Sequence, residues 1–113
     1  MLDAINFKTL VSHMGEAVII SDRDEHILFW NASAQRIFGY SPEEALGKTL
    51  SIITPERFRE RHWDGYKKSM DTGTTRYGTT LLTVPALHKD GKPLSIAFTV
   101  AMLTDASGKV TGI

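Results

Sequence analysis

Apolar and charged positions recur with helical spacing over the stretch from Thr54 to Gly73. At about 100° per residue, one arc of this stretch is mostly apolar and the opposite arc is charged, which predicts an amphipathic helix. Thr54 is placed to cap the first turn, Pro55 stands at the first helical position, and Gly73 follows as a stop signal. The apolar arc consists of Phe58, His62, Trp63, Gly65, Tyr66, Ser69 and Met70.

The part of the chain before this helix contains one helical pattern and two strand patterns. Residues 2–14 carry apolar residues at helical spacing and end at Gly15, which predicts a short amphipathic helix. Residues 17–21 and 26–30 are apolar runs rich in β-branched and aromatic residues. They predict two strands, and the charged residues 22–25 between them predict the turn of a hairpin.

Two short helices with clear cap signals are expected next. Asn31 is a good N-cap for a helix over residues 32–38, and Gly39 ends that helix. Ser41 caps the second helix, which has proline at its first position and glutamate at its third. Gly47 closes this second helix after a single turn.

The pattern changes to strand-like alternation after the long helix. Residues 76–87 predict a strand, in which Pro85 indicates an edge position or a bulge. Residues 88–91 predict a hairpin turn, and residues 93–104 alternate as a second, longer strand. A final strand begins at residue 109 and stops at the last residue. The residues of the longer strand that share one face are Leu94, Ile96, Phe98, Val100 and Met102.

The order of these elements predicts the α+β class, with a five-stranded antiparallel sheet covered on one face by short helices and one long helix. The length of 113 residues suits one domain with one core. We expect residues 1–15 to form an N-terminal flanking helix and residues 16–113 to form the domain, with its final strand truncated. Such an ending suggests a piece of a larger protein.

Composition excludes several functions. Lys and Arg total 13 and Asp and Glu total 13, so no net field favours nucleic acid or an anionic membrane. The absence of cysteine removes disulfides, thiolate catalysis and the cysteine adduct of flavin photosensors. No signal peptide and no apolar run of membrane-spanning length is visible, so a cytoplasmic location is expected. No catalytic triad, phosphate-binding loop or carboxylate pair has a suitable context, so we do not expect an enzyme.

Three blocks of the sequence together resemble the PAS sensor domain: Ala17–Lys48, His88–Leu94 and Thr104–Ile113. In the first block, Asn31, Phe38, Gly39, Tyr40 and Gly47 match the pattern of such domains. The resemblance implies a PAS fold and a sensory domain of a bacterial-type signalling protein, acting on an output domain in the same parent chain. That output domain would be a histidine kinase of a two-component system, a cyclic-dinucleotide enzyme or a transcription regulator. The ligand is left open, because the fold hosts haem, flavins, small acids, metals or nothing.

The helix segment PERFRERHWDGY, residues 55–66, is similar to the ligand helix of the haem-binding PAS domains of oxygen-sensing histidine kinases. His62 falls on the histidine that binds haem iron there, and the 28 residues from His62 to Asp90 match the spacing in that subfamily. The arginine that binds oxygen in that subfamily corresponds to Leu82, which cannot donate a hydrogen bond. The resemblance therefore implies haem b, with carbon monoxide, nitric oxide or redox state as a more plausible signal than oxygen.

A neutral imidazole at His62, on an apolar helix face, could supply one bond to haem iron. Arg59 and Arg76 could meet the carboxylates of a cofactor or an acidic metabolite. Met102 is soft enough to be a second iron ligand. The candidate cofactor-binding residues are His62, Phe58, Arg59, Tyr66, Arg76, Leu82 and Met102, with His62 as the metal ligand.

Each of these assignments has a plainer alternative. His62 could instead be a histidine at the core's rim that bonds a backbone carbonyl. Both arginines could be solvated or paired with Glu56, Glu60 or Asp71, and Met102 could serve only in packing. The whole domain could be a cofactor-free dimerisation or interaction module that uses the helix of residues 2–14, with a homodimer as the expected assembly. It could also bind a small organic acid through Arg59 or Arg76.

Overall fold

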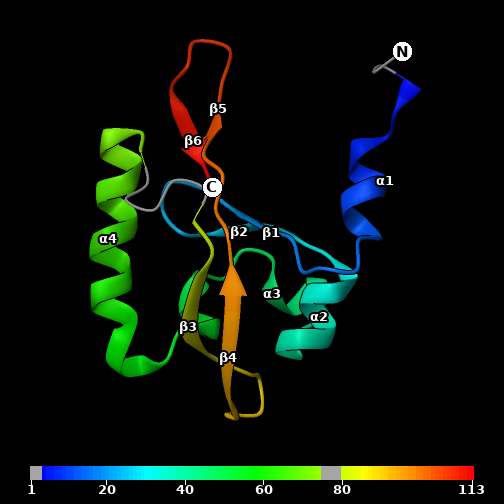
Figure 1. The fold of residues 1–113 in the computed structure, drawn as a ribbon, viewed down its shortest axis with the longest axis vertical. Helices are drawn as coiled ribbons and strands as arrows, with labels where there is room; N and C mark the ends of the chain where they lie inside the picture. Colours follow the sequence, from blue (N-terminus) through cyan, green and yellow to red (C-terminus); the bar gives the residue numbers. More distant parts are fainter. Residues whose placement is uncertain (1–3, 75–79) are drawn as a thin grey trace.

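The structure is a computed structural model that describes residues 4–74 and 80–113. Its strands pair as three antiparallel hairpins (Figure 1). β1 (Ile19–Ser21) pairs with β2 (Ile27–Trp30), β3 (Leu82–Leu87) with β4 (Pro93–Phe98), and β5 (Leu103–Thr104) with β6 (Val110–Gly112). The α+β class with antiparallel strands is therefore confirmed.

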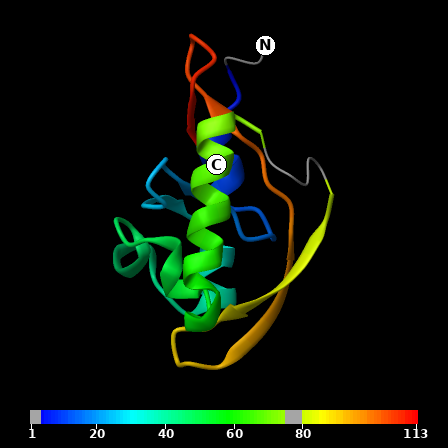
Figure 2. The ribbon, with the colours of Figure 1, turned by 90° about the vertical axis from the view of Figure 1, so that its left-hand side faces the viewer.

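The expected single sheet of five strands is not what forms in the described residues, which hold six strands in three pairs. The strand expected over residues 93–104 is split, because the ladder between β3 and β4 ends at the pair Leu82 and Phe98. The next residues curve away toward β5 (Figure 2). Alternation gives the direction of side chains along a strand, but the extent of pairing depends on where a partner strand lies.

The short helices follow their cap signals. In α2 (Ala32–Phe38) the Asn31 side chain accepts a hydrogen bond from the Ala34 N–H, and Gly39 is left-handed. In α3 (Pro42–Ala45) Ser41 and Glu44 form the expected capping box. The first helix is shorter than predicted: α1 (Phe7–Ser12) begins after Asn6, whose side chain caps it at the Thr9 N–H, and its C-cap is His13, not Gly15.

The long helix begins later than predicted. Two 3₁₀ helices, η2 (Leu50–Ile53) and η3 (Glu56–Phe58), precede α4 (Arg59–Thr72). Thr54 does not cap α4, because its hydroxyl donates to the Leu50 carbonyl at 2.8 Å. Pro55 consequently precedes the 3₁₀ turn instead of opening the α-helix. Gly73 ends α4 in the left-handed conformation with φ 74°, as predicted.

Buried apolar residues gather in two clusters. The larger lies between the β1–β2 hairpin, the short helices and the end of β3, and Trp30 Nε1 donates there to the Tyr40 carbonyl at 2.9 Å. The smaller joins α4 to β6. The buried members are Ile27, Trp30, Ala34, Phe38, Ala45 and Ala86 in the larger cluster, and Tyr66, Met70 and Val110 in the smaller.

The β4 phase is also as predicted. Leu94, Ile96 and Phe98 are half-buried, whereas Ser95 and Ala97 between them are exposed. Pro85 lies in β3, which pairs only with β4 among the described residues, so the edge position is confirmed. Of the helices in the two described ranges, none combines the length and the apolar character that crossing a membrane requires.

Candidate functional site

A cavity of about 1390 Å³ separates α4 from the β3–β4 hairpin. Figure 2 shows the hairpin bowing away from the helix on this side of the molecule. Typical small-molecule sites measure about 300–1,000 Å³ and are mostly apolar, so this space can hold a large flat ligand. Residues on its wall include Phe58, His62 and Tyr66 near or on α4, Leu82 and Val84 on β3, and Ile96 and Phe98 on β4.

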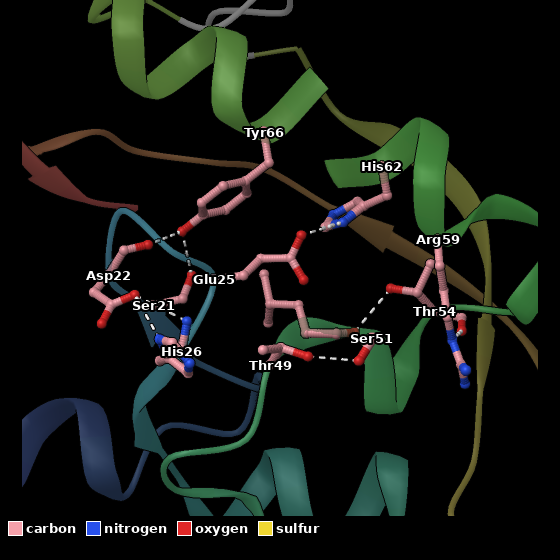
Figure 3. Close-up of polar contacts among 11 residues, drawn as sticks. Ser21, Asp22, Glu25, His26, Thr49, Ser51, Thr54, Arg59, His62 and Tyr66 are labelled. Carbon is pink, nitrogen blue, oxygen red and sulfur yellow. Dashed lines mark hydrogen bonds and ion pairs between the residues drawn. The ribbon is translucent and has the colours of Figure 1, made fainter. Parts of the chain in front are cut away.

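His62 is fixed by a carboxylate that lies far away in sequence. Its Nδ1 is 3.2 Å from Oε2 of Glu25, which reaches across from the turn between β1 and β2 (Figure 3). The side chain of Glu25 is 7% exposed and that of His62 is 39% exposed. A carboxylate accepts the hydrogen of Nδ1, and this contact leaves Nε2 as the ring nitrogen able to bind a further group.

Glu25 has an unusual backbone for its residue type, with φ at 71°. The left-handed conformation costs a residue with a side chain about 1–2 kcal/mol, and glycine or asparagine would adopt it more easily. The carboxylate is nevertheless buried beside an imidazole. The sequence did not indicate this role, because a glutamate in a charged turn has the same pattern whether it faces water or a partner.

Tyr66 borders the cavity one helical turn after His62. Its hydroxyl donates to the Asp22 carbonyl at 2.5 Å, so the Ser21 hydroxyl, 2.8 Å away, donates to Tyr66. Burial, followed by the charges of the carboxylates in the nearby turn, raises the pKa of Tyr66 to about 12. The phenol therefore stays protonated and keeps donating across the ordinary pH range.

The other predicted residues are placed differently. Phe58 and Leu82 line the cavity, but Arg59 does not: its Nε donates to the Thr54 carbonyl at 3.0 Å, beside a separate groove of about 450 Å³. Met102 packs against the α4–β6 cluster, and Arg76 lies outside the described residues. The structure thus brings together four of the seven candidates: His62, Phe58, Tyr66 and Leu82.

Two basic residues of the charged arc of the long helix also line the cavity. They are Arg61 and Lys68, both exposed on α4. Helical periodicity placed them opposite the apolar arc. The cavity is open enough to include part of the charged flank, and nothing local in the sequence reveals this.

The turn between β1 and β2 has a separate cluster of side chains that could be mistaken for a metal site. Ligand atoms of Asp22, Asp24 and His26 lie within 4.8 Å of one another. Asp22 Oδ1, however, already accepts the backbone N–H groups of Asp24 and His26, each at 2.9 Å. This geometry is that of a side-chain-stabilised turn, and it explains the cluster without an ion.

Comparison with known proteins identifies the arrangement. The family model described as "PAS fold" matches residues 6–113. The oxygen sensor protein DosP of Escherichia coli (strain K12) is 29% identical over 108 residues, which cover 96% of this chain and 13% of DosP. The sensor protein FixL of Bradyrhizobium diazoefficiens is 28% identical over 109 residues, which cover 82% of this chain and 22% of FixL. The chain therefore spans only a small part of either relative.

Solved structures agree on the fold. The crystal structure of a PAS domain of a protein from Colwellia psychrerythraea matches with a TM-score of 0.79 and 19% identity, over 94% of this chain and 86% of that one. An RNA-binding light-oxygen-voltage receptor matches with a TM-score of 0.79 and 16% identity, over 94% of this chain and 30% of the receptor. Identities this low show the fold alone.

Proposed function

Because this chain belongs to the PAS family, a family of sensor modules, we propose that it is the sensory part of a larger signalling protein and that it binds haem b between α4 and the β3–β4 hairpin. The observation that carries the proposal is a roomy, mostly apolar cavity with an oriented imidazole on its wall. A haem supplies an iron centre that responds to diatomic gases or to redox state.

The residues present fit that group. His62 would bind the iron through Nε2, while Glu25 accepts the Nδ1 hydrogen and fixes the orientation of the ring. Metal-binding histidines almost always donate their second N–H in this way, to a carboxylate, a carbonyl or water. Phe58, Tyr66 and Leu82 supply the apolar walls that a porphyrin needs.

The basic residues suit the cofactor's carboxylates. Arg61 and Lys68 line the cavity and are exposed to solvent, so they can meet the two haem propionates at its margin. In this role they replace Arg59, whose Nε is turned toward the Thr54 carbonyl.

Leu82 bears on the signal. Its side chain offers no hydrogen-bond donor to a gas held in the cavity. Carbon monoxide, nitric oxide or redox state therefore fits this cavity better than oxygen, although one relative is named an oxygen sensor. The signal would act on an output domain in the same parent chain, such as a histidine kinase or a cyclic-dinucleotide enzyme.

The test is titration of the purified protein with hemin, comparing wild type with His62→Ala and with the control His13→Ala, which changes an exposed histidine next to α1. We expect a Soret band in wild type and in the control. In His62→Ala we expect hemin affinity to fall on the order of tenfold or more, with a shifted Soret maximum that added imidazole restores.

Two results would count against this function. Equal affinity and equal Soret maxima in wild type and His62→Ala would show that His62 is not the ligand. No uptake of hemin above background by either protein would remove the haem proposal. The small-acid pocket would then be favoured, with Arg61 and Lys68 as anion partners in place of Arg59.

The second candidate function is an interaction module, and α1 supports it. Ile5, just before α1, and Phe7 and Leu10, on α1, are 46%, 55% and 54% exposed, so this segment presents apolar side chains to solvent. A second copy of the chain could cover them and form a homodimer. Deletion of residues 1–13 should then shift the protein from dimer toward monomer in sedimentation experiments, and an unchanged number of chains per particle would contradict this role for α1.

A further inference from the structure

One arginine in the turn between β1 and β2 contacts two elements that are distant in sequence. Arg23 Nη1 donates to the Val110 carbonyl of β6 at 2.8 Å and to the Met70 carbonyl of α4 at 3.2 Å. Its Nη2 lies 3.5 Å from Asp71 Oδ1, so the same side chain also reaches an acidic residue in the last turn of the helix. A guanidinium can do this because its donors form a rigid planar fork.

The same turn contacts α4 one helical turn earlier. The buried Tyr66 hydroxyl is bonded to Ser21 and to the Asp22 carbonyl, as Figure 3 shows. Residues 66 and 70 lie on the same face of a helix, so one face of α4 is fastened to residues 21–23 at successive turns.

Ser21, the last residue of β1, and Asp22, the first residue of the turn, lie directly against the end of β6 and the residue after it. Ser21 and Ile113 exchange two backbone hydrogen bonds of 3.0 Å each. At Gly112, an added Cβ would lie 2.3 Å from the Ser21 carbonyl oxygen. This distance is too short for any side chain unless the backbone shifts. A movement of Ser21 must therefore be followed by β6.

We propose that residues 21–23 form a junction that makes α4 and β6 move as one unit and so conveys displacement of α4 to the carboxyl-terminal strand. The cavity borders the same helix, and Tyr66 itself lies on its wall, so an occupant that pushes on α4 also changes the position of β6. The effect of an occupant rests on the proposed function, whereas the coupling between α4 and β6 does not.

The coupling can be tested without any ligand, by hydrogen exchange of the Ile113 amide, which donates to Ser21. Tyr66→Phe keeps the ring and removes only the hydroxyl, which is bonded to the turn and not to β6. We expect exchange at Ile113 to rise roughly fivefold, the effect of losing about one net hydrogen bond. Arg23→Gln should raise exchange both at Ile113 and in the last turn of α4.

The controls are Tyr40→Phe and Arg57→Gln. They remove a phenol hydroxyl and a guanidinium outside the junction and should leave exchange at Ile113 unchanged. If Tyr66→Phe accelerates exchange only within α4 and the turn, the junction does not couple the helix to β6 and the proposal is wrong. Should Arg23→Gln fail to fold by circular dichroism, the Tyr66→Phe result alone decides.

A second measurement tests transmission from the cavity, with hemin as the probe. Hemin should change exchange at Ile113 in wild type, and Arg23→Gln should keep the Soret band while losing at least half of that change. An equal change in both proteins would overturn the proposed route. If hemin is not taken up at all, the haem proposal fails, but the ligand-free comparison still decides the junction.

Discussion

Two apolar regions of this domain pack very differently. Around Trp30 and Phe38 the inward side chains are 3% exposed and interlock with the short helices. On the β3–β4 hairpin, Val84, Ile96 and Phe98 also point inward, yet they are only half-buried and line a cavity. Whether a side chain points toward the interior is therefore decided by its own strand or helix, whereas its burial depends on which element packs opposite it.

The difference follows from how α4 is held. The helix packs on β6 through Tyr66, Met70 and Val110 and is bonded to the β1–β2 turn. These contacts hold it beside the turn and away from the hairpin (Figures 1 and 2). Half-buried apolar side chains around a held-open space are typical of a ligand site.

The largest expected effect is a contrast between two phenylalanines. Phe38→Ala should lower the free energy of unfolding by about 3–5 kcal/mol, because Phe38, although it also borders the cavity, is 3% exposed and packs in the core cluster. Phe98→Ala, on the cavity wall, should cost only about 1 kcal/mol, because less apolar surface returns to water. Urea denaturation of both variants measures the difference, and equal losses would contradict the distinction between the two regions.

Tyr66 lies at the boundary between the packed side of α4 and the cavity. Because burial raises its pKa to about 12 from the ordinary value of about 10, the folded state keeps the phenol proton that the unfolded state loses. Stability from this group is therefore present below pH 10 and is lost as the pH rises through 12, by at most about 2.7 kcal/mol. Urea denaturation at pH values from 9 to 12 should show that the free energy of unfolding falls more steeply with pH in wild type than in Tyr66→Phe. Parallel curves of the free energy against pH would show that water reaches the hydroxyl.

The smallest effect expected is that of filling the cavity. Val84→Phe should change stability by less than about 1 kcal/mol and should reduce hemin uptake, because the new ring enters open space. The matched change Ala34→Leu, at a residue that is 0% exposed, should cost about 1–3 kcal/mol through overpacking. A loss of comparable size at Val84 would mean that the hairpin side is as tightly packed as the core.

The parts of the fold that could be predicted from the sequence are those that neighbouring residues determine. Asn31 and Ser41 cap the helices they were expected to cap, and Gly73 ends α4. The start of α4 was wrong because the Thr54 hydroxyl has a competing acceptor in the preceding 3₁₀ turn. The single sheet was wrong because strand pairing is decided by residues distant in sequence.

In the candidate site, too, the features that neighbouring residues determine could be predicted and those that distant residues determine could not. Helical spacing placed His62 and Tyr66 on one face, and both line the cavity. Glu25 was missed because its contact with His62 spans 37 residues and depends on a left-handed turn residue. Arg59 was misplaced because its side chain returns to the Thr54 carbonyl. Whether this site binds haem stays a prediction for the hemin titration.

Pro85 protects the edge of β3, on the hairpin side of the cavity, against aggregation. β3 pairs only with β4 among the described residues, and its sequence from Leu82 to Leu87 is otherwise the kind of apolar, uncharged segment on which strands of neighbouring molecules add. Proline lacks the N–H that an added strand would need, and it is tolerated where its nitrogen faces an unpaired edge. The hairpin can therefore stay half-covered beside the cavity without its edge serving as a template for fibrils.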